Sequence, residues 1–282
     1  HMFFCISGFI MSFVYLDKVE DTNAKTFFIS RFSRLYPLHF ITLIAVLFVQ
    51  QVSLYTTETY QLFHFNDLYH FVLHLGFISA WGLEKGFSFN MPIWSVSLEI
   101  ICYLLFFITA VRLKKINLYV TSIFLVLLIL YNKIVVGSSD THSDLISCLQ
   151  LFLTGMVVFQ LSKKFKKLHL IIFSAILLAL SIVGNFKIFI FCPAILLIAV
   201  LFEDNFVKII SKKLFSFFGN LTYSLYLWQT PVAIIVILLV KDNINIFYSY
   251  KFFILYFGFL ICLSSLSYYL VEKKLQKLIK SL

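Results

Sequence analysis

Charged residues are scarce in this sequence. Only 13% of its 282 residues are Asp, Glu, Lys or Arg, whereas 61% are hydrophobic and the mean hydropathy is +0.96. Because about a quarter of the residues of a soluble domain are charged, this composition excludes a water-soluble globular protein. The apolar runs do not alternate with polar residues as the strands of a membrane barrel do. We therefore expect an all-α protein, a polytopic bundle of transmembrane helices whose backbone groups are satisfied within each helix.

Cysteine, proline and glycine are also few. The nine glycines and four prolines exclude a low-complexity chain. No two cysteines have the spacing of metal ligands, and we expect them to behave as small hydrophobic residues. The sequence thus predicts neither a disulfide nor a metal site. The cysteines lie singly inside apolar runs, at Cys5, Cys102, Cys148, Cys192 and Cys262.

Nine apolar segments are predicted to cross the membrane. Several are shorter than the ~20 residues that a bilayer favours. A further short segment, 68–82, is interpreted as a buried or re-entrant helix on the outer side, and a turn is expected at Gly184-Asn185. The nine segments are 1–16, 35–55, 93–111, 117–136, 143–162, 169–186, 188–203, 218–240 and 250–271.

The basic residues sort onto alternate connections between these segments. All but five of the 23 lie on one set, which the positive-inside rule assigns to the cytoplasm together with the C-terminus. The net charge of +10 is therefore a topology signal and needs no nucleic-acid partner. We expect a multi-pass membrane protein. The five exceptions, on the outer side, are Lys85, Lys133, Lys187, Lys241 and Lys251.

Glu99 lies within an apolar run, 93–108, that is long enough to span a bilayer. An ionisable group at that depth normally faces a polar cavity or a partner. Ser95 and Cys102 share its helix face, being four residues before and three after it. Two interpretations remain open, a functional cavity and a hydrogen-bonded packing group.

Two arginines precede a proline at the cytoplasmic end of the second segment. Arg31 and Arg34 are three residues apart, and Pro37 is expected in the first turn of the helix. A helix start with two guanidinium groups beside it suits a phosphate, which arginine binds with two parallel hydrogen bonds. The alternative is simple anchoring of the helix by positive charge.

A hydroxyl-rich stretch, 219–231, enters the membrane from the cytoplasm. Tyr226 and Gln229 share a helix face with Thr222, and Pro231 is expected to kink the helix and free a carbonyl. The stretch favours a polar groove. The alternative is an interfacial aromatic belt with hydrogen bonds between helices, which explains Gln229 poorly.

Four histidines are candidates for chemistry, namely His39, His64, His70 and His74. His70 and His74 have the i, i+4 spacing of a metal pair, but no acidic residue follows His70 as in a zinc-protease motif. Interfacial histidines are the simpler interpretation.

Five motifs, in order along nearly the whole chain, resemble those of acyltransferase family 3, the bacterial inner-membrane O-acyltransferases. Each motif is weak alone, but the set and its spacing are specific. They are FFCISGF at 3–9, RFSRLYP at 31–37, NMPIWSVSLE at 90–99, YSLYL at 223–227 and SYYLVE at 267–272.

The resemblance implies a single membrane domain over 1–282 with about nine of the ten helices that the family typically has. Such a domain moves an acyl group from cytoplasmic acyl-CoA to a sugar hydroxyl. The acceptor would be a cell-surface polysaccharide, such as lipopolysaccharide, or its lipid-linked precursor, and the acyl group is expected to be acetyl. Acyl-CoA is a co-substrate, and no cofactor is bound. Arg31 and Arg34 would contact the CoA phosphates, and Glu99 would be catalytic. The reaction groove would be lined by Ser7, Trp94, Ser95, Tyr223, Ser224, Tyr226 and Gln229.

The sequence departs from the family pattern in two places. The family's first helix, which carries a basic residue and a histidine, is not seen before Phe3, and we expect the chain alone not to turn over. Gln229 stands where many members have histidine, and glutamine cannot act as a base. Two other functions remain open: a transporter of a lipid-linked sugar or acyl donor, although no inverted repeat is visible, and a non-catalytic truncated remnant.

Overall fold

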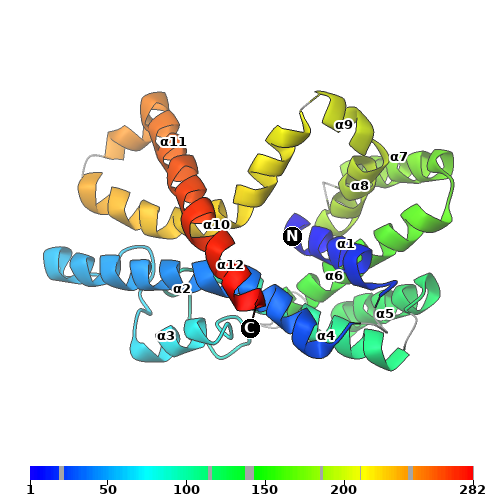
Figure 1. The fold of residues 1–282 in the computed structure, drawn as a ribbon, viewed down its shortest axis with the longest axis horizontal. Helices are drawn as coiled ribbons and strands as arrows, with labels where there is room; N and C mark the ends of the chain where they lie inside the picture. Colours follow the sequence, from blue (N-terminus) through cyan, green and yellow to red (C-terminus); the bar gives the residue numbers. More distant parts are fainter. Residues whose placement is uncertain are drawn as a thin grey trace. The chain divides into compact units, whose positions relative to one another are not determined.

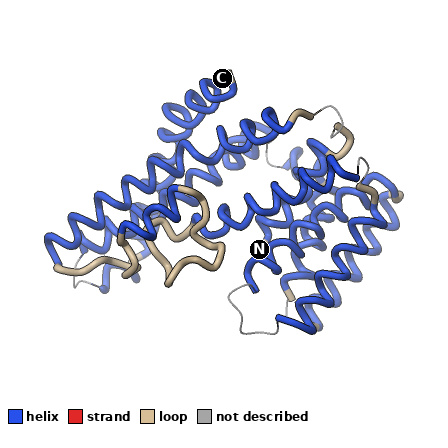
Figure 2. The backbone as a smooth tube through the Cα atoms, turned by 90° about the horizontal axis from the view of Figure 1, so that it is seen from below, coloured by secondary structure: helices blue, strands red, loops and turns tan. Residues whose placement is uncertain are grey.

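The computed structural model of the chain describes residues 1–18, 22–113, 116–136, 143–184, 187–209, 211–240 and 244–281. Helix is the only regular secondary structure in these ranges, as Figure 2 shows. The all-α prediction is confirmed. Some predictions fall outside the described residues. They concern Asn185 of the expected turn and three lysines of the charge pattern, Lys114, Lys115 and Lys241.

The chain divides into two compact units. Unit 1 comprises residues 1–23 and 98–212, and unit 2 comprises residues 24–97 and 213–282. The boundary falls inside α4 (Ile93–Leu113), whose first residues belong to unit 2, and after Lys212, the first residue of α10 (Lys212–Val240). The single domain expected over 1–282 stays a prediction. Unit 1 contains α1 (Met2–Tyr15), most of α4 (Ile93–Leu113), α5 (Leu118–Tyr131), the π-helical η1 (Asn132–Val136), α6 (Ser143–Lys164), α7 (Lys167–Val183), α8 (Ile188–Leu201) and α9 (Glu203–Ile209).

The closest packing in unit 1 joins α1 to α6 (Figure 1). A side chain at Gly8 would collide with the backbone of Phe152, and one at Gly155 would collide with the backbone of Cys5. Small residues let helix backbones approach closely where lipid supplies no hydrophobic drive for association. These two glycines therefore set the distance between α1 and α6.

Unit 2 is built on the long helix α2. The last turns of the chain, η3 and α12, pack against it. A short helix, α3, begins where the Asp67 side chain accepts a hydrogen bond from the His70 amide, at 2.9 Å. Unit 2 contains α2 (Ala24–Thr57), α3 (Leu68–Leu75), the start of α4, α10 (Lys212–Val240), η2 (Ile244–Tyr248), α11 (Tyr250–Ser267), η3 (Tyr268–Glu272) and α12 (Lys273–Lys280).

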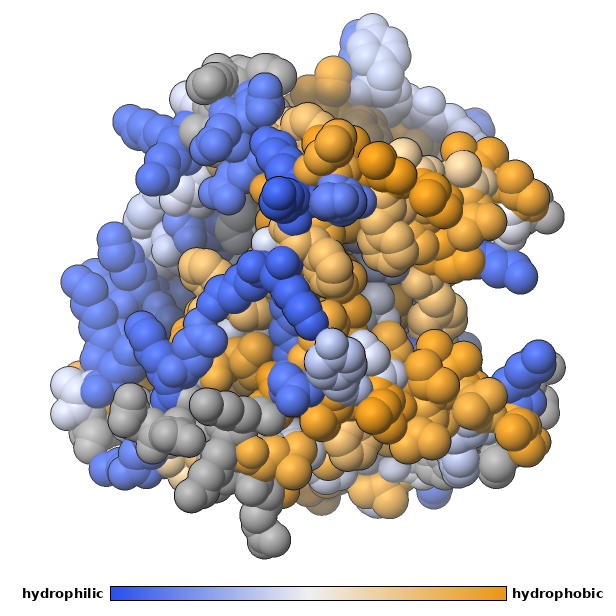
Figure 3. Space-filling view, turned by 90° about the vertical axis from the view of Figure 1, so that its right-hand side faces the viewer, coloured by the Kyte–Doolittle hydropathy of each residue, from blue (hydrophilic) through white to orange (hydrophobic). Residues whose placement is uncertain are grey.

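Each of the nine predicted spans overlaps an apolar helix of the described residues. Five described helices are long and apolar enough to cross a membrane, and the other four contain 10–17 residues. Large apolar side chains are exposed, for example Val183 at 84% and Leu255 at 72%. Figure 3 shows wide apolar areas on one face of the molecule. Such exposure is costly in water and is expected of a surface that lipid covers.

The predicted start of the second span is wrong. Helix α2 begins at Ala24, so Arg31 and Arg34 lie inside it and Pro37 is an interior residue. Residues 24–36 contain no proline or glycine to end a helix, and they bury Phe27 and Ser33 against the unit. An interior proline costs about 3 kcal/mol relative to alanine, but membrane helices tolerate it where neighbouring groups satisfy the freed carbonyl. Likewise, α9 and the first turns of α10 fall in the predicted connection 204–217.

Candidate active site

A carboxylate, Glu99, is buried at the contact of α4 with α1 in unit 1. Its side chain is 1% exposed, and one of its oxygens, Oε1, accepts hydrogen bonds from two hydroxyls. Tyr103 Oη donates at 2.6 Å, and Ser7 Oγ donates from the facing helix. Ser7 also lies 3.3 Å from Tyr103 Oη. The three side chains form a hydroxyl–carboxylate cluster, the Glu99 cluster, that ties α1 to α4.

Cys102, which was predicted to share the Glu99 face, lies one helical turn further along α4. It is buried, and its Sγ is 3.4 Å from Cys148 Sγ on α6. It lines an apolar pocket of about 220 Å³ between α4, α5 and α6. The residues that line this pocket are apolar apart from Cys102, Thr109 and Thr121, and Glu99 lines none of the three pockets that we describe.

A second, polar pocket of about 240 Å³ lies in unit 2, between α2, α10 and the C-terminal turns of the chain. Arg34 lines it from α2, one turn before Pro37, and Arg31 does not. The Nη2 atom of Arg31 instead donates to Ser30 Oγ at 3.3 Å. The other residues that line this pocket, which we call the Arg34 pocket, are Ser33, Pro37, Asn220, Tyr223, Tyr268, Glu272 and Gln276.

Glu272 is the acidic residue of the Arg34 pocket. Its Oε1 accepts from Ser224 Oγ at 2.5 Å and lies 3.5 Å from Ser267 Oγ. Arg34 attracts it electrostatically. Of the predicted groove residues, Tyr223 lines this pocket and its hydroxyl donates to the Leu35 carbonyl at 2.7 Å. Ser224 does not line it but contacts Glu272. The pocket presents one cation, one carboxylate and several hydroxyl and amide groups.

Pro231 leaves the carbonyl of Leu227 without its helical donor, as the sequence predicted, because proline has no amide hydrogen. The buried Asn90 amide donates to that oxygen at 3.2 Å and to Thr42 Oγ1 at 2.9 Å. On the same helix, Tyr226 Oη is 3.0 Å from Ser95 Oγ on the first turn of α4. This polar seam joins α2, α4 and α10 within unit 2.

Two other predicted groove residues lie near the seam. Trp94 is half-buried, one residue before Ser95. Gln229 is also half-buried, and its backbone carbonyl accepts from Tyr256 Oη at 3.4 Å.

Two of the candidate histidines, His39 and His74, join a different buried network in unit 2, whereas His64 is exposed. His39 Nε2 contacts the His74 carbonyl at 2.8 Å, and His74 Nε2 contacts Ser88 Oγ at 3.0 Å. His70 instead pairs with Asp67 at 2.7 Å and accepts from the Lys85 amide. No group of three or more histidine, cysteine or acidic side chains among the described residues could hold a metal ion.

The predicted site residues therefore divide between the two units. Ser7 and Glu99 belong to unit 1, and the two arginines and the remaining groove residues belong to unit 2. Sequence reasoning missed Tyr103, although its i, i+4 spacing from Glu99 places it on the same helix face. It also missed Glu272 as a pocket residue, because only the tertiary fold brings it to Arg34.

The apolar helices define a polytopic membrane protein, and polar and ionisable side chains such as Glu99 are buried within it. A family model for the acyltransferase domain matches residues 1–272. The chain belongs to acyltransferase family 3, and it is a multi-pass membrane protein of that family. No curated protein and no solved structure matches it.

Proposed function

We propose that this protein is an O-acyltransferase that takes an acyl group, acetyl in the first instance, from cytoplasmic acyl-CoA. The acceptor is a hydroxyl of a surface polysaccharide or of its lipid-linked precursor, and the membrane is the bacterial inner membrane. The family supports the reaction class, and the Arg34 pocket supports the donor.

The Arg34 pocket is the observation that carries the donor proposal. A guanidinium group that lines a polar pocket suits a phosphate, because its planar fork matches the phosphate oxygens. Tyr223, Asn220 and Gln276 add hydroxyl and amide groups to the same lining. Arg31 lies one turn earlier on α2, outside the pocket lining, and adds a second positive charge to the same helix.

Acyl transfer also needs a base and a donor for developing negative charge. The acceptor oxygen attacks the thioester carbon, the carbon–sulfur bond breaks, and CoA leaves as a thiolate that takes up a proton. In this proposal Glu99 receives the proton of the attacking hydroxyl. The hydroxyls of Ser95 and Tyr226, which face each other at 3.0 Å, suit the oxyanion.

Binding of CoA to the purified protein in detergent, measured by calorimetry, tests the donor site. Arg34→Ala should weaken binding about tenfold, since a hydrogen bond to a charged group contributes about 1.5–3 kcal/mol. Arg34→Lys should restore it only in part, and Arg31→Ala should weaken it to a smaller degree. Glu272→Gln should tighten binding, because the amide still accepts from Ser224 but no longer competes with phosphate for Arg34.

The matched control is Lys277→Ala, which removes one exposed positive charge from α12 outside the pocket lining. Binding should then remain close to wild type. Wild-type affinity in Arg34→Ala, or equal losses in Arg34→Ala and Lys277→Ala, would remove the donor assignment.

A further inference from the structure

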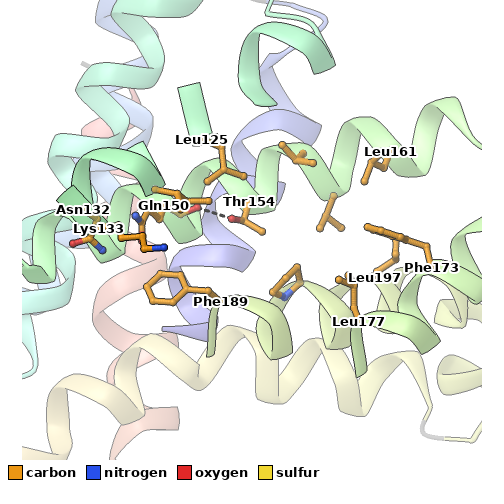
Figure 4. Close-up of a pocket in the computed structure, with 14 residues that line it drawn as sticks. Leu125, Asn132, Lys133, Gln150, Thr154, Leu161, Phe173, Leu177, Phe189 and Leu197 are labelled. Atoms are coloured by element: carbon orange, nitrogen blue, oxygen red, sulfur yellow. Dashed lines mark hydrogen bonds between the residues drawn. The ribbon is translucent and has the colours of Figure 1, made fainter. Parts of the chain in front are cut away.

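The largest of the three pockets that we describe lies in unit 1, and none of the candidate site residues lines it. Its volume is about 590 Å³, within the range of ligand sites, and it is open to the outside of the helix bundle. It lies between α5, η1, α6, α7 and α8 (Figure 4). The two ends of the pocket differ in polarity.

One end of this pocket is polar. Lys133, Asn132 and Gln150 gather there, with Thr154 one turn further along α6 (Figure 4). The Gln150 amide donates to the Leu128 carbonyl at 3.2 Å, and the Thr154 hydroxyl donates to the Gln150 carbonyl at 2.6 Å. Lys133 is exposed, and none of the residues that line the pocket is acidic. The polar end therefore carries a net positive charge.

The opposite end is apolar. Leu161, Phe173, Leu177 and Leu197 line it, and Figure 4 places them far along the pocket from Lys133. A site with a long hydrocarbon wall and one cation at its mouth is complementary to an amphiphile with an anionic head. Polar molecules without a chain would leave this wall unfilled.

We propose that this pocket binds an anionic membrane phospholipid, with one acyl chain along the apolar wall and the phosphate beside Lys133 and Asn132. The basic-residue pattern places Lys133 at the outer end of its helix, so the lipid belongs to the outer leaflet. Lysine serves a phosphate as a point charge, and the Asn132 amide supplies a hydrogen-bond donor.

Native mass spectrometry of the purified protein, titrated with phosphatidylglycerol or with phosphatidylcholine of the same chains, tests this proposal. Phosphatidylglycerol should bind several-fold more tightly. Lys133→Gln should remove that preference while leaving phosphatidylcholine binding unchanged. Leu177→Trp should weaken the binding of both lipids, because the indole fills the chain end of the pocket.

The matched control is Lys187→Gln, which removes another exposed lysine of the outer set that does not line the pocket. It should leave the lipid preference as in wild type. Equal affinity for the two lipids in the wild-type protein, or the same loss in Lys187→Gln as in Lys133→Gln, would overturn the headgroup site. Displacement of bound phosphatidylglycerol by a lower concentration of a polyprenyl phosphate would overturn the phospholipid assignment. If Leu177→Trp fails to fold, Lys133→Gln still decides the proposal, since its side chain is exposed.

Discussion

The Asn90 side chain donates to the carbonyl of Leu227, at 3.2 Å, and this is the oxygen that Pro231 leaves without a helical partner. The same amide donates to Thr42, so one buried side chain in the loop before α4 links α2 to α10. A proline that breaks one hydrogen bond is thereby built into the packing of α10 rather than ending it.

Asn90→Ala should destabilise the protein by about 1–3 kcal/mol, because it leaves the buried Leu227 carbonyl without a donor. Pro231→Ala restores an amide hydrogen at position 231, which can bond that carbonyl within the helix. In the Pro231→Ala background the cost of Asn90→Ala should therefore be smaller. Wild type, the two single variants and the double variant form a double-mutant cycle, and their unfolding in detergent measures the coupling energy between Asn90 and Pro231. Strictly additive losses of stability would contradict the hydrogen bond from Asn90 to the Leu227 carbonyl.

Gly8→Ala should loosen or displace α1, because the added methyl group meets the backbone carbonyl of Phe152 and not a flexible side chain. The expected loss is about 1–3 kcal/mol, the usual cost of overpacking. Gly258→Ala is the matched control, since a methyl group there meets nothing within 4 Å. Thermal midpoints of the two variants should differ, with Gly258→Ala near or above wild type. Equal midpoints would show that Gly8 does not set the α1–α6 distance.

Glu99→Gln should keep the fold and lose most acyl transfer in membranes that contain the complete active system. Glutamine retains an acceptor for Ser7 and Tyr103, but it cannot take a proton. Tyr103→Phe removes one donor and leaves the carboxylate in place, so it controls for disturbance of the cluster. Activity should fall far more in Glu99→Gln than in Tyr103→Phe at equal stability. Equal activities would assign Glu99 to packing.

Acid should destabilise the network around His74. Burial, together with the nearby His39 and His70, lowers the pKa of His74 from 6.5 to about 3. The unfolded chain therefore binds a proton that the folded chain does not, and stability should fall as the pH drops from about 6.5 towards 3, by up to about 1.4 kcal/mol per pH unit.

Comparison with His74→Gln isolates this contribution, because glutamine can bond Ser88 and does not titrate in that range. The thermal midpoint of wild type should fall more steeply below pH 6.5 than that of His74→Gln. Parallel pH profiles would mean that other groups, such as His39 and Asp67, account for the acid sensitivity.

The primary structure by itself determined the class of fold. In lipid, a single segment can satisfy its own backbone hydrogen bonds only as a helix. Long apolar runs with few charges were therefore enough to predict nine helical spans. The missing amide hydrogen of Pro231 is likewise a covalent property, and the freed carbonyl could be predicted without a structure.

The contacts between helices and the start of α2 were decided only by the tertiary structure. The start of α2 at Ala24, the pairing of Asn90 with Leu227 and the approach of Glu272 to Arg34 join positions far apart in the chain or override a local signal. In lipid, helix ends and helix contacts depend on which small and polar side chains meet across the interface. Which side chains meet across an interface is a property of the packed helices, and it cannot be predicted from the periodicity of a single helix.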